Sequence, residues 1–217
     1  MKDKKPKSSL QENIEAVIIA VIIAMFIRTF IIQAFKIPSG SMLETLQIGD
    51  QILVNKFIYG IKIPFTDGKT LIPVKNPQKG DIVVFQYPVD PSKDFIKRVV
   101  ATGGDTVEII EKKLYVNDRL TDGGTYAIYE DSTIYPPNYP EISRARRDNL
   151  RKIKVPENKL FVMGDNRDNS HDSRFWGFVD LKDVRGKALI IYWSWNKDQF
   201  VPLWASVRWN RIGDILR

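Results

Sequence analysis

The stretch AVIIAVIIAMFIRTFIIQAF occupies residues 16–35 of a 217-residue chain and contains one charged side chain, Arg28. An α-helix of about 20 residues rises roughly 1.5 Å per residue and so crosses the approximately 30 Å hydrocarbon core of a bilayer. The stretch has no polar face, which a helix packed on a soluble domain would normally keep. It predicts a transmembrane anchor over residues 14–35, preceded by a basic tail at residues 1–13.

A cleaved signal peptide is the competing interpretation, because a basic start followed by the shorter apolar run at residues 16–27 also fits that pattern. No small-x-small cleavage signal follows, since apolar residues resume soon after Arg28, and an uncleaved anchor is favoured. The four lysines of the tail predict a cytoplasmic N-terminus, with everything after Phe35 on the outer side. The formal charge of +7 therefore gives no reason to expect nucleic-acid binding.

Beyond residue 50 the sequence is dominated by short runs rich in β-branched and aromatic residues, separated by Gly, Pro, Asn and Asp. Such runs predict strands, and they are ILVNKFIYG, DIVVFQYP, DFIKRVVATGG, TVEII, KLYVNDRL, KLFVMGD and KALIIYWSW. Asn117 and Asp118 lie between two extended runs and indicate a tight hairpin, because both residue types tolerate positive φ. We expect a mainly β protein with antiparallel sheet, preceded by one N-terminal membrane helix.

Residues 106–157 differ in composition from the runs on either side. We interpret this segment as an inserted smaller β lobe within a core made of residues 36–105 and 158–217. Its basic run, RARRDNLRKIK at residues 144–154, is typical of a solvated face, with contact to anionic lipid headgroups as the alternative. The chain has no cysteine, which excludes disulfides and thiolate metal sites.

The motif IPSGSM at residues 37–42 follows the anchor directly. Gly40 allows a tight turn between Ser39 and Ser41, and Pro38 fixes the φ angle before them. Alone, this motif is typical of a simple turn. A serine nucleophile also needs a base elsewhere in the chain.

Two side chains could supply that base. His171, the single histidine, lies in GDNRDNSHDSRFWG, where a Ser-His-Asp triad is possible, although a lone loop histidine is more often solvated and holds no metal by itself. Lys97 lies in DFIKRVVATGGD, where strand alternation places Phe95 and Val99 on its side. Burial there would lower the pKa of the amine and allow it to take a serine proton. A structural basic pair with Arg98 is the alternative.

Four blocks occur in order along the chain: IPSGSM directly after the membrane helix, then GDIVVF, FIKRVVATGGD and GDNRDNSHDSRFWG. Together they resemble the type I signal peptidases, membrane-anchored Ser-Lys proteases that remove signal peptides from exported proteins. The resemblance covers nearly the whole chain from the anchor to the last block. Each block alone is a weak signal, but four in order behind an anchor make a specific match.

The resemblance implies roles for individual residues. Ser41 matches the nucleophile and Lys97 the general base. The Ser39 hydroxyl matches the group that joins the Ser41 backbone N–H in an oxyanion hole, and Ser170 matches the hydroxyl that orients the lysine amine. The residues that match those holding the site together are Asp165, Asp172 and Arg174. The residues that match those lining the shallow substrate pockets are Phe35, Ile37, Met42, Leu46 and Ile96.

Two positions depart from the family pattern. Glu44 stands where proline is common, and Thr102-Gly103 replaces the usual residue-Pro before Gly-Asp. Both positions shape the backbone, so the departures concern local loop geometry and leave the Ser41–Lys97 dyad untouched.

The resemblance implies a single-pass serine endopeptidase of the cytoplasmic (inner) membrane, with an antiparallel β-sheet catalytic domain on the outer side. It would cut signal-peptide-bearing preproteins after small residues, at Ala-x-Ala sites, close to the secretion machinery and without metal or cofactor. Two alternatives remain: a specialised peptidase of the same clan that matures one conjugation or pilus subunit, and an inactive membrane-tethered assembly protein.

Overall fold

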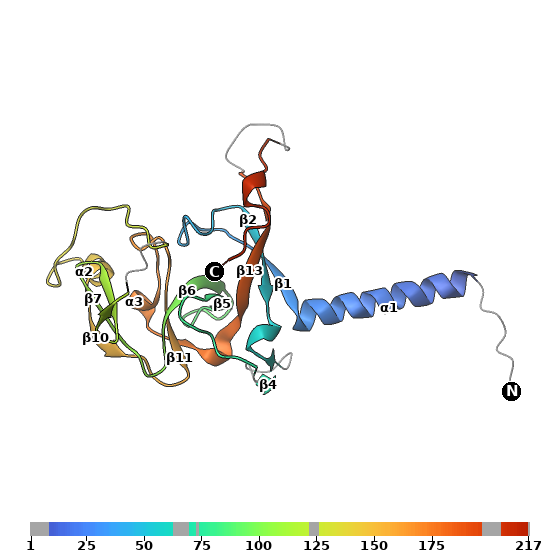
Figure 1. Ribbon diagram of the computed structural model, residues 1–217, viewed down its shortest axis with the longest axis horizontal. Helices are drawn as coiled ribbons and strands as arrows, with labels where there is room; N and C mark the ends of the chain where they lie inside the picture. The colour runs from blue at the N-terminus through green and yellow to red at the C-terminus, as the bar shows by residue number, and fades with distance from the viewer. Residues whose placement is uncertain (1–8, 63–69, 73, 122–125, 197–204, 217) are drawn as a thin grey trace.

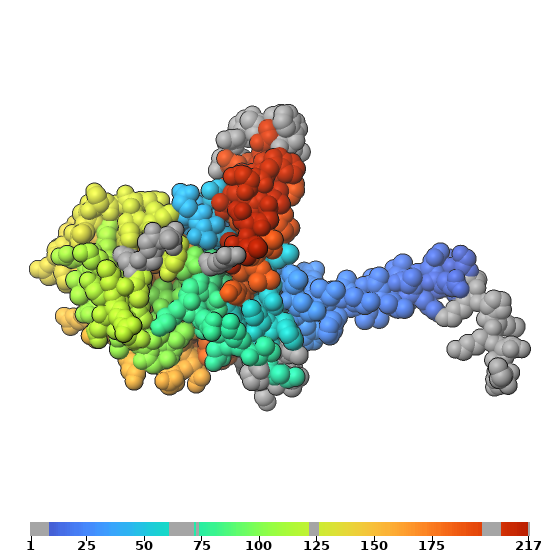
Figure 2. Space-filling model, in the orientation of Figure 1, coloured from blue at the N-terminus to red at the C-terminus, as the bar shows by residue number. Residues whose placement is uncertain are grey.

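The computed structural model describes residues 9–62, 70–72, 74–121, 126–196 and 205–216, and part of the basic tail lies outside these ranges. Its first element, helix α1 (Ser9–Phe30), projects from a mainly β body (Figure 1). The helix is long and apolar enough to cross a membrane, and none of its residues is buried in the protein. The space-filling view shows it standing clear of the body (Figure 2). Such exposure suits a helix that lipid surrounds.

The helix ends at Phe30, whereas the sequence predicted an anchor reaching Phe35. Residues Ile32–Lys36 instead form strand β1, which pairs antiparallel with β2 (Asp50–Asn55). The apolar run continues past the helix because Phe35 packs against the core of the β body. A helix in lipid and a strand over a core are both apolar, so composition does not separate them.

The largest sheet has seven antiparallel strands in the order β1-β2-β13-β5-β6-β11-β12. Its remaining strands are β5 (Ile82–Gln86), β6 (Asp94–Thr102), β11 (Lys159–Met163), β12 (Val179–Asp180) and β13 (Val184–Ser194). A two-stranded sheet pairs β3 (Ile61–Lys62) with β4 (Thr70–Ile72), and short helical segments cover Phe57–Tyr59, α3 (Ser173–Trp176), Leu181–Asp183 and Trp209–Arg211. The prediction of strands in the seven apolar runs is confirmed.

A second sheet of four strands lies between β6 and β11 in the chain, at the end of the body away from α1 (Figure 1). Its order is β10-β7-β8-β9, with bounds Leu150–Lys154, Thr106–Ile110, Lys113–Val116 and Arg119–Leu120. Asn117 and Asp118 have φ angles of 51° and 61° and join β8 to β9, which confirms the predicted hairpin.

The basic run of this segment forms helix α2 (Ile142–Asp148) and strand β10. Several of its cations pair with carboxylates: Arg144 with Glu141, Arg147 with Asp131 and Asp148, and Lys152 with Asp118. Two apolar residues of the run, Leu150 and Ile153, pack against the cluster that joins the two sheets. The run is therefore partly a packed and ion-paired element.

That cluster contains side chains from both sheets. Its buried members are Val100, Ala101, Phe161 and Met163 from the β6–β11 region, Val107, Ile109, Leu114 and Val116 from the four-stranded sheet, and Val155. Because burial of shared apolar surface stabilises both parts, the small sheet is fixed against the strand that carries Lys97.

Candidate functional site

Ser41 lies in a tight turn just after β1. Leu43 N donates to Gly40 O over 3.2 Å, and Leu46 N donates to Met42 O over 2.7 Å. The side chains of Met42 and Leu46 are fully buried in a core cluster, which fixes the turn. Ser41 itself is 9% exposed.

Lys97 reaches the same point from β6. Its Nζ donates to Ser41 Oγ over 2.7 Å and to Ile96 O over 3.0 Å. The amine lies 5.5 Å from the centroid of the Phe95 ring, and the residue is only 4% exposed. The two side chains that the sequence placed in a dyad are therefore in direct contact.

Burial lowers the pKa of Lys97 to about 8, from the ordinary value of 10.5. The charges of Asp172 and Asp165 act in the opposite direction, but they do not outweigh the loss of solvation. An amine with a pKa of about 8 is neutral in about a tenth of the molecules at pH 7, and a proton acceptor must be neutral.

A cleft of about 360 Å³ opens beside this pair. It is lined by Pro38, Ser39, Ser41, Asp94, Phe95, Ile96, Lys97, Asn169 and His171. Four predicted site residues, Ser39, Ser41, Ile96 and Lys97, thus line one cavity, and Ser39 lies exposed in its wall. Asp94 and Asn169 are cleft residues that no sequence motif singled out.

Of the five residues expected to line substrate pockets, Ile96 is the one that lines this cleft. The other four pack behind it in one core cluster, where Ile37, Met42 and Leu46 are buried and Phe35 is partly buried. Direct substrate contact by these four stays a prediction.

Asp165 connects the last sequence block to β6 and to the turn that carries Ser41. Arg98 Nε and Nη2 donate to its two carboxylate oxygens over 2.8 and 2.7 Å. Thr45 Oγ1 donates to Asp165 Oδ2 over 2.6 Å. Asn166 N, the next donor along the chain, reaches Ser41 O over 3.2 Å. One buried carboxylate and its neighbour therefore hold the turn that carries Ser41.

Asp172 and Arg174 form the second buried pair. Arg174 Nε and Nη2 donate to Asp172 over 2.8 and 2.9 Å, and Gly164 N donates to Asp172 Oδ2 over 3.1 Å. Burial alone would raise the pKa of Asp172, but the Arg174 charge and these hydrogen bonds hold it below its ordinary value. A Cβ on Gly164 would come within 2.3 Å of both Ser170 Oγ and Ser41 O, so only glycine fits there.

Ser170 and His171 differ from their predicted or alternative roles. Ser170 is buried beside the site, but no hydrogen bond joins its Oγ to Lys97 within the described residues, so a role in orienting the amine stays a prediction. His171 is exposed and makes edge contacts with the rings of Tyr87 and Phe175. In the described part of the chain its imidazole makes no hydrogen bond to Ser41.

The two departures from the family pattern lie in turns. The Leu43–Glu44 peptide bond is cis. After β6, Asp105 accepts hydrogen bonds from Thr102 N and Thr102 Oγ1 over 2.9 and 3.1 Å, and Gly104 has a φ of 90°. The carboxylate thereby closes a tight turn without proline.

Comparison with known proteins identifies the family of this chain. Residues 10–193 match the family described as signal peptidase, peptidase S26. The signal peptidase I of Pseudomonas aeruginosa is 41% identical over 211 residues, which cover 87% of this chain and 73% of that protein. The signal peptidase I of Aquifex aeolicus is 36% identical over 220 residues, covering 81% of each. A crystal structure of a signal peptidase I from Enterococcus faecalis V583 matches at 29% identity with a TM-score of 0.38, over 52% of this chain and 97% of that one. The chain belongs to the signal peptidase family, peptidase S26.

Proposed function

We propose that this membrane-anchored signal peptidase hydrolyses preproteins with a dyad of Ser41 and Lys97. The observation that carries the proposal is the 2.7 Å hydrogen bond between the buried Lys97 amine and Ser41 Oγ. Neutral Lys97 takes the hydroxyl proton as Oγ attacks the scissile carbonyl, and it returns that proton to the leaving amine. It then takes a proton from water, whose attack on the acyl-Ser41 ester releases the signal peptide, and it returns that proton to Ser41 Oγ.

The negative charge that develops on the carbonyl oxygen needs donors. Ser39 lies in the cleft wall, two residues before the nucleophile, and its hydroxyl is free to turn toward the cavity. Together with the Ser41 backbone N–H it would form an oxyanion hole, in which one donor is typically worth about 2.7–4 kcal/mol of transition-state stabilisation.

The cleft fits substrates with small side chains before the cut. Its volume is about 360 Å³, and its walls include the dyad and the apolar side chains of Phe95 and Ile96. Behind Ile96, the packed residues Ile37 and Met42 leave no room for the wall to retreat, and close-packed interiors yield little to added volume. We infer specificity of the Ala-x-Ala type.

We infer that this cleft lies close to the bilayer. Helix α1 ends at Phe30, and β1 leads from it directly to the Ser41 turn. With the lysines of the tail in the cytoplasm, the catalytic domain would lie on the outer face of the cytoplasmic membrane. Preproteins emerge there from the secretion machinery, so we infer that the enzyme works close to it.

We assign residues 36–105 and 158–217 to the catalytic core and residues 106–157 to an inserted lobe. Strands β7 to β10 support this division, because all four lie between residues 106 and 154 and form a sheet of their own. The chain leaves the seven-stranded sheet after β6 and rejoins it at β11.

The test is cleavage of a purified preprotein with an Ala-x-Ala site by the full-length enzyme in detergent, followed by sequencing of the new N-terminus. We expect one cut, directly after the second alanine, and no cut when that alanine is replaced by leucine. Ser41→Ala should not cleave at all. Cleavage by Ser41→Ala, or cuts that ignore the leucine replacement, would contradict the proposed mechanism or specificity respectively.

A further inference from the structure

The segment at residues 126–131, here called the strap, comes after β9 in the chain and lies along the loop at residues 165–170 that follows β11. Ile128 N donates to Asp165 O over 2.8 Å, and Arg167 N donates to Ile128 O over 2.9 Å. These two bonds form a short parallel bridge between the strap and the loop. The strap therefore contacts the backbone on both sides of Asn166.

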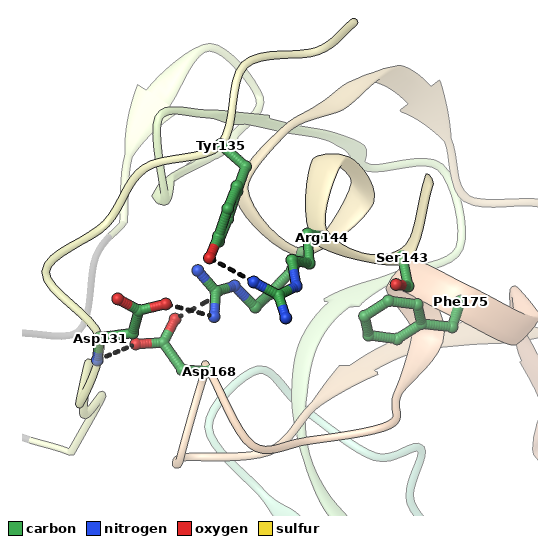
Figure 3. Close-up of a pocket in the computed structure, with 7 residues that line it drawn as sticks. Asp131, Tyr135, Ser143, Arg144, Asp168 and Phe175 are labelled. Carbon is green, nitrogen blue, oxygen red and sulfur yellow. Dashed lines mark hydrogen bonds and ion pairs between the residues drawn. The ribbon is translucent and has the colours of Figure 1, made fainter. Parts of the chain in front are cut away.

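The C-terminal end of the strap is fixed to the same loop. Asp131 N donates to Asp168 Oδ2 over 2.8 Å, a contact drawn in Figure 3. Lys112 Nζ donates to Asp168 Oδ1 over 2.9 Å and also bonds Asp131 O. Between these ends, the Glu130 carboxylate accepts from Asn166 Nδ2 over 3.0 Å. The contacts run along the length of the strap, so it and the loop are one packed unit.

At its N-terminal end the strap places an aromatic ring on the buried ion pair. The Arg98 guanidinium carbon lies 4.0 Å from the centroid of the Tyr126 ring. Arg98 is 2% exposed, and its polar contacts include the Asp165 carboxylate and Gly80 O. A ring face attracts a cation most strongly where water is excluded. Tyr126 thus holds Arg98 against Asp165.

The same carboxylate accepts the Thr45 hydroxyl from the nucleophile turn, and the next residue, Asn166, donates its N–H to Ser41 O. A shift of Arg98 or Asp165 would therefore move Ser41 relative to Lys97, which is the residue before Arg98 on β6. A misplacement of about 1 Å at reacting groups can lower a rate by about 100-fold. The path from the strap to the Ser41 turn passes through contacts of 4.0, 2.8 and 2.6 Å.

Resting on the Ser41–Lys97 function above, we propose that the strap is a positioning element for the nucleophile and that Tyr126 is its principal positioning side chain. Tyr126 does not line the cleft, so it acts through Arg98 and Asp165 and not through the substrate. The inserted lobe then contributes to turnover by holding the loop at residues 165–170 in place.

The test uses the full-length enzyme and compares steady-state constants of Tyr126→Ala with those of Tyr126→Phe. Loss of the ring should lower kcat by about tenfold or more, while KM stays within about twofold because substrate binding is untouched. Phenylalanine keeps the ring face over Arg98 and should restore kcat to within about twofold of wild type. Tyr139→Ala is the matched control, because Tyr139 is also a half-buried tyrosine of the lobe but contacts Tyr135 instead of the loop.

Several outcomes would overturn the proposal. One is an unchanged kcat per folded molecule in Tyr126→Ala, and another is an equal loss in Tyr139→Ala. Failure of phenylalanine to restore kcat would also contradict it. If Tyr126→Ala does not fold, Tyr126→Leu replaces it, since leucine keeps apolar bulk without a ring face and should lower kcat. Ser41→Ala in the same assay tests the proposed function separately, because its result does not depend on the strap.

Discussion

Lys97 and Arg98 are neighbours on β6, both almost fully buried, yet their surroundings are opposite. Side chains at successive strand positions leave on opposite faces. Arg98 meets a bidentate carboxylate, a carbonyl and an aromatic ring. Lys97 meets a hydroxyl and a carbonyl, and no carboxylate lies within ion-pair distance of it among the described residues. One strand therefore carries a buried cation that is paired with a carboxylate next to a buried cation that is not.

The difference shows how burial can serve either stability or chemistry. A buried guanidinium stays protonated, so it needs a partner of opposite charge. With Asp165, Arg98 forms a fixed ion pair between β6 and the loop at residues 165–170. A buried amine can release its proton instead, and without a partner it does so at a lower pH. Exchanging the lysine and the arginine would therefore remove both the proposed base and the Arg98–Asp165 ion pair.

The largest expected effect on activity comes from removing Lys97 or its hydrogen-bond partner, Ser41. Ser41→Ala and Lys97→Ala should each lower kcat/KM by more than about 1,000-fold, because nucleophile and base act as a unit. For the same reason the double variant should be no worse than either single one. Preprotein cleavage, with circular dichroism to check the fold, measures this. Substantial activity in either single variant would refute the dyad.

The second effect separates the two cations by stability. Arg98→Met leaves the buried Asp165 carboxylate without its ionic partner and should reduce the free energy of unfolding by about 3–5 kcal/mol. Lys97→Met removes a buried charge that has no carboxylate partner, and we expect it to be at least as stable as wild type at pH 7. Urea denaturation of the two variants provides the measurement. Equal destabilisation by both would show that the two environments do not differ energetically.

The third effect is a pH dependence. A protonated Lys97 cannot accept the serine proton, so kcat/KM should fall about tenfold per pH unit below an apparent pKa near 8. Lys97→Arg, which keeps its charge at every accessible pH, should lack activity throughout. The rate profile from pH 5 to 10 tests this. An acid limb centred near the ordinary histidine value would point to another base.

The lowered pKa of Lys97 also makes the stability of the fold depend on pH. Burial disfavours the charged amine, so Lys97 opposes folding in full below about pH 8, and this penalty disappears as the pH rises toward 10.5. Wild type should therefore gain stability relative to Lys97→Met across that interval.

Much of this contrast was predictable from sequence. The runs of β-branched residues gave the strands, and the block order gave Ser41 and Lys97 as partners although they are 56 residues apart. Strand alternation also separated Lys97 from Arg98, and the fixed charge of arginine excluded it as a base. These inferences succeed because they depend on local period and on intrinsic side-chain chemistry.

The partners of Arg98 were not predictable in the same way. Asp165 was expected to hold the site together, but its pairing with Arg98, 67 residues away, depends on which strands become neighbours. Tyr126 lies in a turn-rich segment with no period of its own, and its contact with Arg98 depends on how the lobe packs. The end of the anchor was missed for a related reason, since an apolar run does not show where lipid ends and a protein core begins.

The smallest expected effect concerns His171, which shares the cleft with the dyad. Its ring makes edge contacts with Tyr87 and Phe175 and no hydrogen bond to Ser41 among the described residues. His171→Ala should therefore keep kcat within about twofold of wild type and leave the acid limb near pH 8 in place. Kinetics across the pH range measure both properties with one variant. A loss approaching that of Ser41→Ala, or a displaced acid limb, would make the imidazole the base and reduce Lys97 to the structural role that Arg98 has on the other face of the strand.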